Sequence, residues 1–271
     1  MEIMDCTLRD GANIVGKGFS AKITEKILKI LVDCKIPYIE FGNAGGIGAY
    51  EVSNFNTALT DKEYLEIGKE FINQGSKIGM FLNASRYREK YVDLANEYKL
   101  NFLRVGTDAD DFKKAIPVIE KICDTGMEAY YSAMKAYIIS SKEIVKSAKT
   151  LEKSGLKIFT IMDSAGTMTP EQVREYISEL KEKTNLKIAF HGHNNLGISV
   201  ANGLAATKAG ADIIDCGIMG MARSAGNIPT EVMIANLERQ GINHGIDLYG
   251  LLGDLEDLEK YFDDINFINY I

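Results

Sequence analysis

The sequence predicts an α/β fold, a closed (β/α)8 barrel with a short helical extension at its C-terminal end. Three observations support this prediction. Short apolar runs rich in Ile, Val, Phe and Tyr alternate with longer helical patterns, the alternation occurs eight times before residue 240, and 271 residues suit one barrel of ~250 residues. We therefore expect a single barrel domain over residues 1–240 and a helical tail over residues 241–271.

The eight predicted strands are short and apolar, as expected of a parallel sheet that is buried on both faces. In chain order they cover residues 3–8, 38–41, 77–82, 102–105, 128–133, 158–162, 187–190 and 213–216. Eight βα units favour a closed TIM barrel over an open doubly wound sheet.

The predicted helices carry apolar residues at three- and four-residue spacing, which places one apolar stripe against the barrel. The first stripe consists of Ile23, Ile27, Leu31 and Cys34. The sixth helix begins at a capping hydroxyl, Thr169, followed by Pro170 and a reciprocal Gln172. Glycines are expected to end four of the helices: Gly75, Gly126, Gly155 and Gly210.

The tail over residues 241–271 is acidic and amphipathic. Its leucines have helical spacing and indicate a helix that packs across the barrel or against another subunit. These leucines are Leu248, Leu251, Leu252, Leu255 and Leu258.

The composition points to small-molecule partners. A net charge of -7 opposes the broad positive surface that nucleic acid or an anionic membrane requires. The four cysteines are widely spaced without a CxxC pair, which indicates thiols in a reducing compartment. Neither a signal peptide nor an apolar run of ~18 residues is present in the sequence, so we expect a cytoplasmic protein.

A metal site is predicted where the strands end, because barrel enzymes carry their functional residues on that face. His191 and His193 are two residues apart on an extended strand, so both imidazoles point to the same side. Asp10 follows the first strand and supplies a carboxylate. Two histidines and one carboxylate with open positions suit Mn, Fe, Co or Zn. The alternatives are hydrogen-bonded surface histidines and an aspartate that caps the turn at Gly11.

Three charged residues are candidates for catalysis beside this site. The guanidinium of Arg9 suits a carboxylate or an enolate oxygen. Glu40 would pair with Arg9 and orient it, which is ordinary support for a binding group. Asp163 is expected to give similar support, or else to form a turn that leads into the helix starting at Pro170.

Four motifs together resemble the DRE-TIM metallolyase superfamily across the whole barrel. They are Asp-Cys-Thr-Leu-Arg-Asp-Gly at 5–11, Ile-Glu at 39–40, Asp-Ser-Ala-Gly at 163–166 and His-Gly-His-Asn-Asn-Leu-Gly at 191–197. That superfamily includes 4-hydroxy-2-oxovalerate aldolase, hydroxymethylglutaryl-CoA lyase and the isopropylmalate and homocitrate synthases. The resemblance implies that Asp10, His191 and His193 bind a divalent metal with Asn227 as a fourth ligand, and that Arg9 and Glu40 serve an enolate site.

The segment 217–231 looks more like the aldolase branch than the acyl-CoA condensing branch. The condensing enzymes usually carry a Glu where Arg223 stands, and they usually continue into further domains. The resemblance therefore implies a metal-dependent aldolase that cleaves or forms a 4-hydroxy-2-oxo acid through a pyruvate-type enolate. Mn2+ is the expected ion, with Mg2+, Co2+ or Zn2+ as alternatives. The partners would be a 2-oxo acid and an aldehyde, and a homodimer is expected.

Two features depart from the characterised oxovalerate aldolases. Asn13 occupies the position of a catalytic His, and an amide cannot act as a general base near neutral pH. Candidate replacements are Tyr131, Tyr137, His244, Tyr249 and Tyr261. The tail of 31 residues after Gln240 is shorter than the domain that docks those aldolases to a dehydrogenase, so we expect no channelling to such a partner.

Three other functions stay open at this point. An acyl-CoA Claisen condensation would keep the metal and Arg9 but would need a nucleotide site. Lys135 follows the fifth strand and could form a Schiff base in a metal-free aldolase. A catalytically silent barrel would be consistent with Asn13. Cys216 is interpreted as a thiol of the barrel core.

Overall fold

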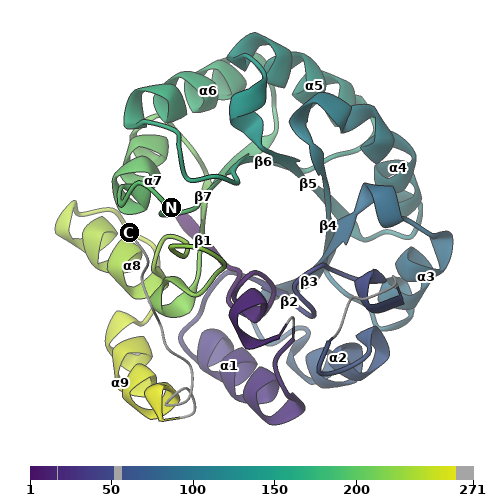
Figure 1. The fold of residues 1–271 in the computed structure, drawn as a ribbon, viewed down its shortest axis with the longest axis vertical. Coiled ribbons are helices and arrows are strands. Elements are labelled where there is room, and N and C mark those ends of the chain that lie inside the picture. Colours follow the sequence, from purple (N-terminus) through teal and green to yellow (C-terminus); the bar gives the residue numbers. More distant parts are fainter. Residues whose placement is uncertain (17, 52–56, 261–271) are drawn as a thin grey trace.

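The computed structural model describes residues 1–16, 18–51 and 57–260. Eight parallel strands follow one another around a closed barrel (Figure 1). The barrel is closed by pairing of β8 with β1. The strands are β1 Glu2–Asp5, β2 Tyr38–Phe41, β3 Lys77–Asn83, β4 Phe102–Asp108, β5 Glu128–Met134, β6 Ile158–Asp163, β7 Lys187–Gly192 and β8 Ile213–Cys216. The predicted TIM barrel is therefore confirmed.

Helices form a ring around the barrel and cover its outer face (Figure 1). They are α1 Ala21–Asp33, α2 Asp61–Gly68, α3 Glu89–Glu97, α4 Ile116–Asp124, α5 Ser141–Lys153, α6 Pro170–Lys183, α7 Ser199–Lys208, α8 Thr230–Arg239 and α9 Leu248–Glu259. In α6 the predicted capping box is present: Thr169 Oγ1 accepts the Gln172 N–H, and Gln172 Oε1 accepts the Thr169 N–H. The four glycines predicted to end helices all have positive φ, between 86° and 105°.

The predicted end of the first strand was wrong. We expected residues 3–8, but β1 ends at Asp5. Asp5 Oδ1 accepts the Thr7 N–H at 2.9 Å, and the Cys6 carbonyl accepts the N–H groups of Arg9 and Asp10 at 3.1 and 2.7 Å. A carboxylate that binds the amide two residues ahead stabilises a turn instead of a strand. This turn brings Arg9 and Asp10 to the C-terminal end of the barrel, whereas β3 to β7 extend one to three residues beyond their predicted ends.

The N-terminal end of the barrel is closed by a basal ion-pair layer made of Glu2, Tyr38, Lys77, Glu128 and Lys187. Lys187 Nζ lies 2.6 Å from Glu2 Oε2, and Lys77 Nζ lies 2.7 Å from Glu128 Oε1. Both ammonium groups lie within 6 Å of the centre of the Tyr38 ring, at 5.8 and 5.9 Å, which is the range of a cation–π contact. In this fold the N-terminal end contributes to stability, while the C-terminal end carries the chemistry.

The tail begins with a helix that packs on the barrel's outer ring. Helix α9 contacts α1 and α8, and the Asp247 N–H donates to the Cys34 carbonyl at 3.0 Å. Of its five predicted leucines, four are buried and Leu252 is 42% exposed. Residues 261–271 lie outside the described part of the chain, so the predicted division at residue 240 stays a prediction. No helix among the described residues is both long and apolar enough to cross a membrane.

Candidate metal centre and active site

Asp10, His191 and His193 meet at the C-terminal mouth of the barrel, as the sequence predicts. Asp10 Oδ2 lies 3.4 Å from His191 Nε2 and 3.6 Å from His193 Nε2. One ligand atom from each residue lies within 4.8 Å of the others, and all three side chains are buried. His191 lies in β7 and His193 directly follows it in a bridge to Asn227, so the alternation of side chains along extended backbone explains why both imidazoles point the same way. The three groups are therefore close enough to share one ion.

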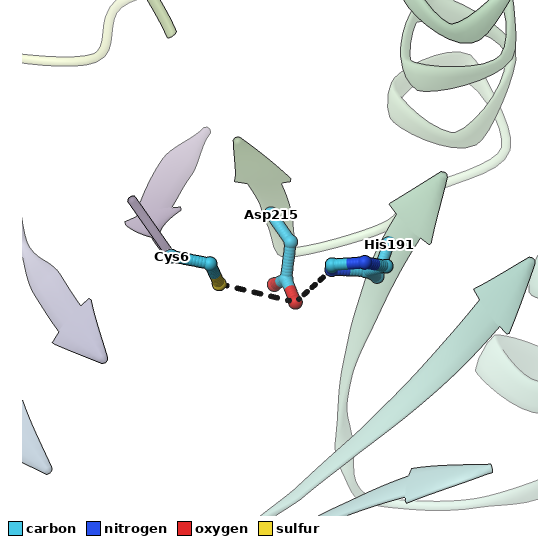
Figure 2. Close-up of side chains that lie close together, drawn as sticks. All are labelled: Cys6, His191 and Asp215. Atoms are coloured by element: carbon cyan, nitrogen blue, oxygen red, sulfur yellow. Dashed lines mark hydrogen bonds and ion pairs between the residues drawn. The ribbon is translucent and has the colours of Figure 1, made fainter. Parts of the chain in front are cut away.

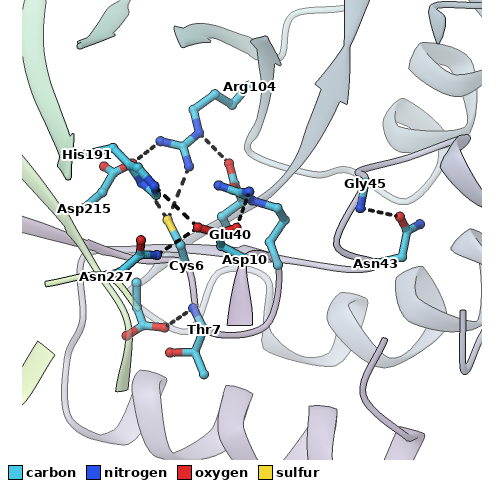
Figure 3. A network of polar contacts seen from close by, with 12 residues as sticks. Cys6, Thr7, Asp10, Glu40, Asn43, Gly45, Arg104, His191, Asp215 and Asn227 are labelled. Atoms are coloured by element: carbon cyan, nitrogen blue, oxygen red, sulfur yellow. Dashed lines mark hydrogen bonds and ion pairs between the residues drawn. The ribbon is translucent and has the colours of Figure 1, made fainter. Parts of the chain in front are cut away.

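Asn227 adds a fourth polar group to this cluster. Its Nδ2 donates to Asp10 Oδ2 at 2.9 Å (Figure 3). Among the described residues, Asn227 Oδ1 and His191 Nε2 are buried and have no hydrogen-bond partner. Buried polar atoms usually find partners, so these orphaned atoms point to a ligand that completes the site. A carboxylate, two imidazoles and an amide oxygen are suitable donors for a divalent cation.

The electrostatics of Asp10 and His193 favour a cation, whereas burial lowers the pKa of His191 but the carboxylates of Asp10 and Asp215 outweigh it and raise that pKa. Burial raises the pKa of Asp10, but Arg9, His191 and His193 outweigh it and hold that pKa well below its usual range. Burial lowers the pKa of His193 to about 4, so this imidazole is neutral near pH 7. An ionised carboxylate and a neutral imidazole are the forms that bind metals.

A buried network of charges adjoins the cluster at Asp10 and His191 (Figure 3). Arg9 Nε donates to one oxygen of Glu40, and Arg104 Nε donates to the other. Arg104 Nη1 donates to Asp215 Oδ2, and this same oxygen lies 3.1 Å from His191 Nδ1. The predicted pairing of Arg9 with Glu40 is thus present. Glu40 also links Arg9, through Arg104 and Asp215, to the histidine on the far side of the site.

Sequence reasoning missed Arg104 and Asp215. Both have 0–1% of their surface exposed, although they lie in the middle of β4 and β8. Charged residues are almost never fully buried unless they are paired. A charged residue within a strand predicted to be buried on both faces was therefore the available signal.

Cys6, Asp215 and His191 form a second cluster of possible metal ligands (Figure 2). Arg104 already supplies its positive charge: Nη1 binds Asp215, and Nη2 lies 3.3 Å from Cys6 Sγ. Burial raises the pKa of Cys6 well above its usual value, so sulfur remains a thiol. We interpret this cluster as support for His191 and not as a second metal site.

Asp163 is not brought together with Arg9 and Glu40. Its carboxylate accepts the N–H groups of Thr167 and Met168 at 3.1 and 2.9 Å, as in the alternative turn interpretation. Its carbonyl accepts the His193 N–H at 3.3 Å. Asp163 therefore shapes the loop that carries His193, and a direct role in catalysis stays a prediction.

A cavity of about 240 Å³ opens above the cluster. Its lining includes Arg9, Asp10, Asn13, both histidines of the cluster, Arg86 and Arg223. Asn13 Nδ2 donates to Asp10 Oδ1 at 3.2 Å and to the Asp10 carbonyl at 2.9 Å. Asn13 therefore helps to orient Asp10, a candidate metal ligand.

The proposed replacements for that histidine lie elsewhere. None of the four that the structure describes lines the cavity. Tyr131 is buried and its hydroxyl lies 2.6 Å from Thr107 Oγ1, while Tyr249 is 82% exposed on α9. Tyr261 is outside the described residues. Lys135 also lies away from the cavity lining and binds Asp108 at 2.7 Å, which argues against a Schiff base there.

The comparisons with known proteins agree with this architecture. The model of the HMGL-like family matches residues 1–257. A 4-hydroxy-2-oxovalerate aldolase from Serratia proteamaculans is 35% identical over 94% of this chain and 76% of its own length. An oxaloacetate decarboxylase from Mycobacterium tuberculosis is 33% identical over 91% of this chain and 72% of its own length.

Solved structures share the fold at lower identity. The N-terminal domain of a candidate aldolase from Bacteroides vulgatus has a TM-score of 0.83 at 24% identity, and covers 97% of this chain and 88% of that one. The carboxyl transferase domain of Rhizobium etli pyruvate carboxylase has a TM-score of 0.77 at 20% identity, over 93% of this chain and 46% of that one. The family model matches nearly the whole chain, and relatives above 30% identity match more than nine tenths of it, so the chain belongs to the HMGL-like family.

Proposed function

We propose that this protein is a divalent-metal-dependent aldolase that cleaves or forms a 4-hydroxy-2-oxo acid through a pyruvate-type enolate. The observation that carries the proposal is the convergence of Asp10, His191 and His193 beside Arg9 in one cavity. The related 4-hydroxy-2-oxovalerate aldolase from Serratia proteamaculans supports the same reaction class.

Asp10, His191 and His193, with Asn227 Oδ1, would hold the ion, which when bound acts as a Lewis acid for a 2-oxo acid. Arg9 would stabilise the negative charge that develops on the keto oxygen. Its Nη2 is buried and has no hydrogen-bond partner among the described residues, while its Nε is fixed by Glu40. A donor that is already oriented stabilises developing charge without further rearrangement.

Cleavage breaks the bond between C3 and C4 of the substrate. The hydroxyl proton leaves to a base, the C4 oxygen becomes the aldehyde oxygen, and the electron pair of the broken bond forms the enolate. Protonation at C3 then gives pyruvate. Condensation is the reverse, and in both directions Arg9 faces the oxygen that bears the charge.

The test measures by NMR how fast pyruvate C3 protons exchange with heavy water. The protein is assayed once with Mn2+ and once with a chelator. We expect exchange that needs Mn2+ and is lost in Asp10→Asn and Arg9→Met. Retro-aldol activity is measured in parallel as pyruvate release from 4-hydroxy-2-oxovalerate. Absence of exchange in the Mn2+-loaded protein would refute the proposal. Thiol release from acetyl-CoA plus pyruvate would instead identify a Claisen condensing enzyme.

Asn13 favours a second candidate, the decarboxylation of a 3-carboxylated 2-oxo acid such as oxaloacetate. Loss of CO2 leaves its electron pair as the enolate and needs no base for a hydroxyl proton. Within the described cavity lining, the histidines and the carboxylate all belong to the candidate metal cluster. The decarboxylase from Mycobacterium tuberculosis supports this reading. Release of CO2 and pyruvate from oxaloacetate, faster than with free Mn2+ alone, tests this candidate.

The remaining expectations belong to the same proposal. We expect Mn2+ as the ion, a cytoplasmic location and a homodimer. Metal analysis of the purified protein and its mass in solution measure the first and the last.

A further inference from the structure

The cavity holds more positive charge than a simple 2-oxo acid requires. Three guanidinium groups line it, from Arg9, Arg86 and Arg223, and Asp10 is the one carboxylate in the described lining. Glu40 balances Arg9 from below. A bound divalent ion would add further positive charge. The carboxylate of pyruvate would balance only part of this charge.

Arg86 and Arg223 have no role in the reaction described above, and Arg86 Nη2 donates to the Gly45 carbonyl at 2.9 Å, so Arg223 is the stronger candidate for binding a ligand. It follows β8 and is exposed at the cavity, so its guanidinium is accessible to a ligand. Its charge also reaches the candidate metal cluster: burial is the main cause that lowers the pKa of His193, and Arg223 lowers it further.

The loop that carries Arg223 has a defined shape. Its residues Met219 and Ser224 have φ of 52° and 57°, a left-handed conformation that non-glycine residues rarely adopt. The Gly226 N–H donates to the Arg223 carbonyl at 3.2 Å. Asn195, from the motif after β7, accepts the Ala225 N–H at 3.1 Å. Unusual backbone held by surrounding contacts is concentrated at ligand-binding sites.

The known relatives' substrate gives this cation nothing to bind. In 4-hydroxy-2-oxovalerate, the chain ends in a methyl group beyond the hydroxyl carbon. A guanidinium offers directed donors to a carboxylate or a phosphate and is a poor neighbour for a methyl group. A leaving carboxylate also fits poorly, because an ion pair to it would oppose the loss of CO2.

We propose that Arg223 selects a substrate whose aldehyde portion ends in a second anionic group, a carboxylate or a phosphate. The reaction leaves this group unchanged. This inference rests on the proposed aldolase function. In the condensation, C3 of pyruvate releases a proton and bonds to the aldehyde carbon, and the aldehyde oxygen takes up a proton. The anionic group is unchanged and stays paired with Arg223.

The test compares three aldehydes with pyruvate: acetaldehyde, glyoxylate and glycolaldehyde phosphate. We expect kcat/KM for at least one anionic aldehyde to exceed that for acetaldehyde by about 10- to 100-fold, the range for a charge-assisted hydrogen bond. Arg223→Ala should abolish this preference, and Arg223→Lys should keep part of it. Arg239→Ala, an exposed arginine on α8, is the matched control and should keep it in full. The preferred aldehyde distinguishes carboxylate from phosphate.

A binding measurement needs no turnover. 2-Oxoglutarate and 2-oxovalerate differ in a terminal carboxylate against a methyl group, and neither has a hydroxyl to cleave. Calorimetry should show at least about tenfold tighter binding of 2-oxoglutarate by the Mn2+-loaded protein, lost in Arg223→Ala. The inference would be overturned if 2-oxoglutarate and 2-oxovalerate bound equally well and if Arg223→Ala lowered kcat/KM for all three aldehydes by the same factor. Failure of pyruvate proton exchange would refute the proposed function, and the binding pair would still decide the role of Arg223.

Discussion

Replacing Arg104 with Met tests whether the buried charge network stabilises the barrel. Arg104 has no exposed surface and donates to both Glu40 and Asp215. Charge-assisted hydrogen bonds contribute about 1.5–3 kcal/mol each. Removing one partner from a buried ion pair costs about 3–5 kcal/mol, because it leaves a buried charge uncompensated. Since Glu40 keeps Arg9 and Asp215 keeps His191, we expect the free energy of unfolding to fall by about 4 kcal/mol at pH 8.

The loss should depend on pH in a definite direction. Burial raises the pKa of Glu40 and of Asp215, but Arg104 is the main cause that lowers both pKa values below normal. Carboxylates with a lowered folded pKa contribute stability above their unfolded pKa of about 4, and this contribution is lost as the pH falls. The difference between wild type and Arg104→Met should therefore be largest above about pH 5 and should shrink below about pH 4.

Urea unfolding in the presence of a chelator measures this difference without a contribution from metal binding. The matched control is Arg174→Met, whose exposed pair with Glu171 on α6 should change stability by less than about 1 kcal/mol. If Arg104→Met costs no more than the control at pH 8, or if its cost rises as the pH is lowered, the reasoning about the network is refuted.

Three further predictions concern other parts of the molecule. Asp10→Asn should weaken Mn2+ binding by more than the ~10- to 100-fold typical of losing a residue that only supports a ligand. The rise in Tm that Mn2+ causes should disappear in this variant. An undiminished rise would exclude Asp10 as a ligand. In Gly166→Ala, with φ of +60°, the Cβ would lie 2.5 Å from the His193 carbonyl oxygen, so this variant should weaken Mn2+ binding measurably. The control Gly75→Ala has open space around it and strain only from its φ of +105°, so it should cost ~1–2 kcal/mol of stability and leave Mn2+ binding unchanged. Burial raises the pKa of Asp61 to about 7. Its contribution to stability is full below about pH 4 and should be lost as the pH rises through about 7. Asp61→Asn should remove this dependence of the free energy of unfolding on pH, and an unchanged dependence would show that the carboxyl titrates normally.

The barrel could be predicted because its signals are local. Each strand is a short apolar run, and helix starts such as Thr169 and stops such as Gly75 are encoded within a few residues. The end of β1 could not be predicted in the same way, because residues 6–8 are as apolar as a strand. The turn depends on the side chain of Asp5 binding the backbone of Thr7, a contact that competes with strand pairing.

The residues of the candidate site could also be predicted only where their signals are local. Asp10, His191 and His193 could be found because their spacing places them at strand ends, which share one face in any such barrel. Arg104 is 64 residues from Glu40 in the sequence and 111 residues from Asp215. Only the closed barrel brings these three side chains together. Asn13 suggested a missing group, and its role as a donor to Asp10 became visible only with the turn that precedes it.

The basal ion-pair layer lies at the end of the barrel opposite the cavity. Lys77, Lys187 and their partners occupy this end. The N-terminal ammonium group donates to the Asn243 carbonyl at 3.1 Å, in the segment that connects α8 to α9. The cavity that Asp10 and the two histidines line opens at the loops that follow the strands. The opposite face is the place to attach an affinity label or a solid support, because a linkage there would leave that opening unobstructed.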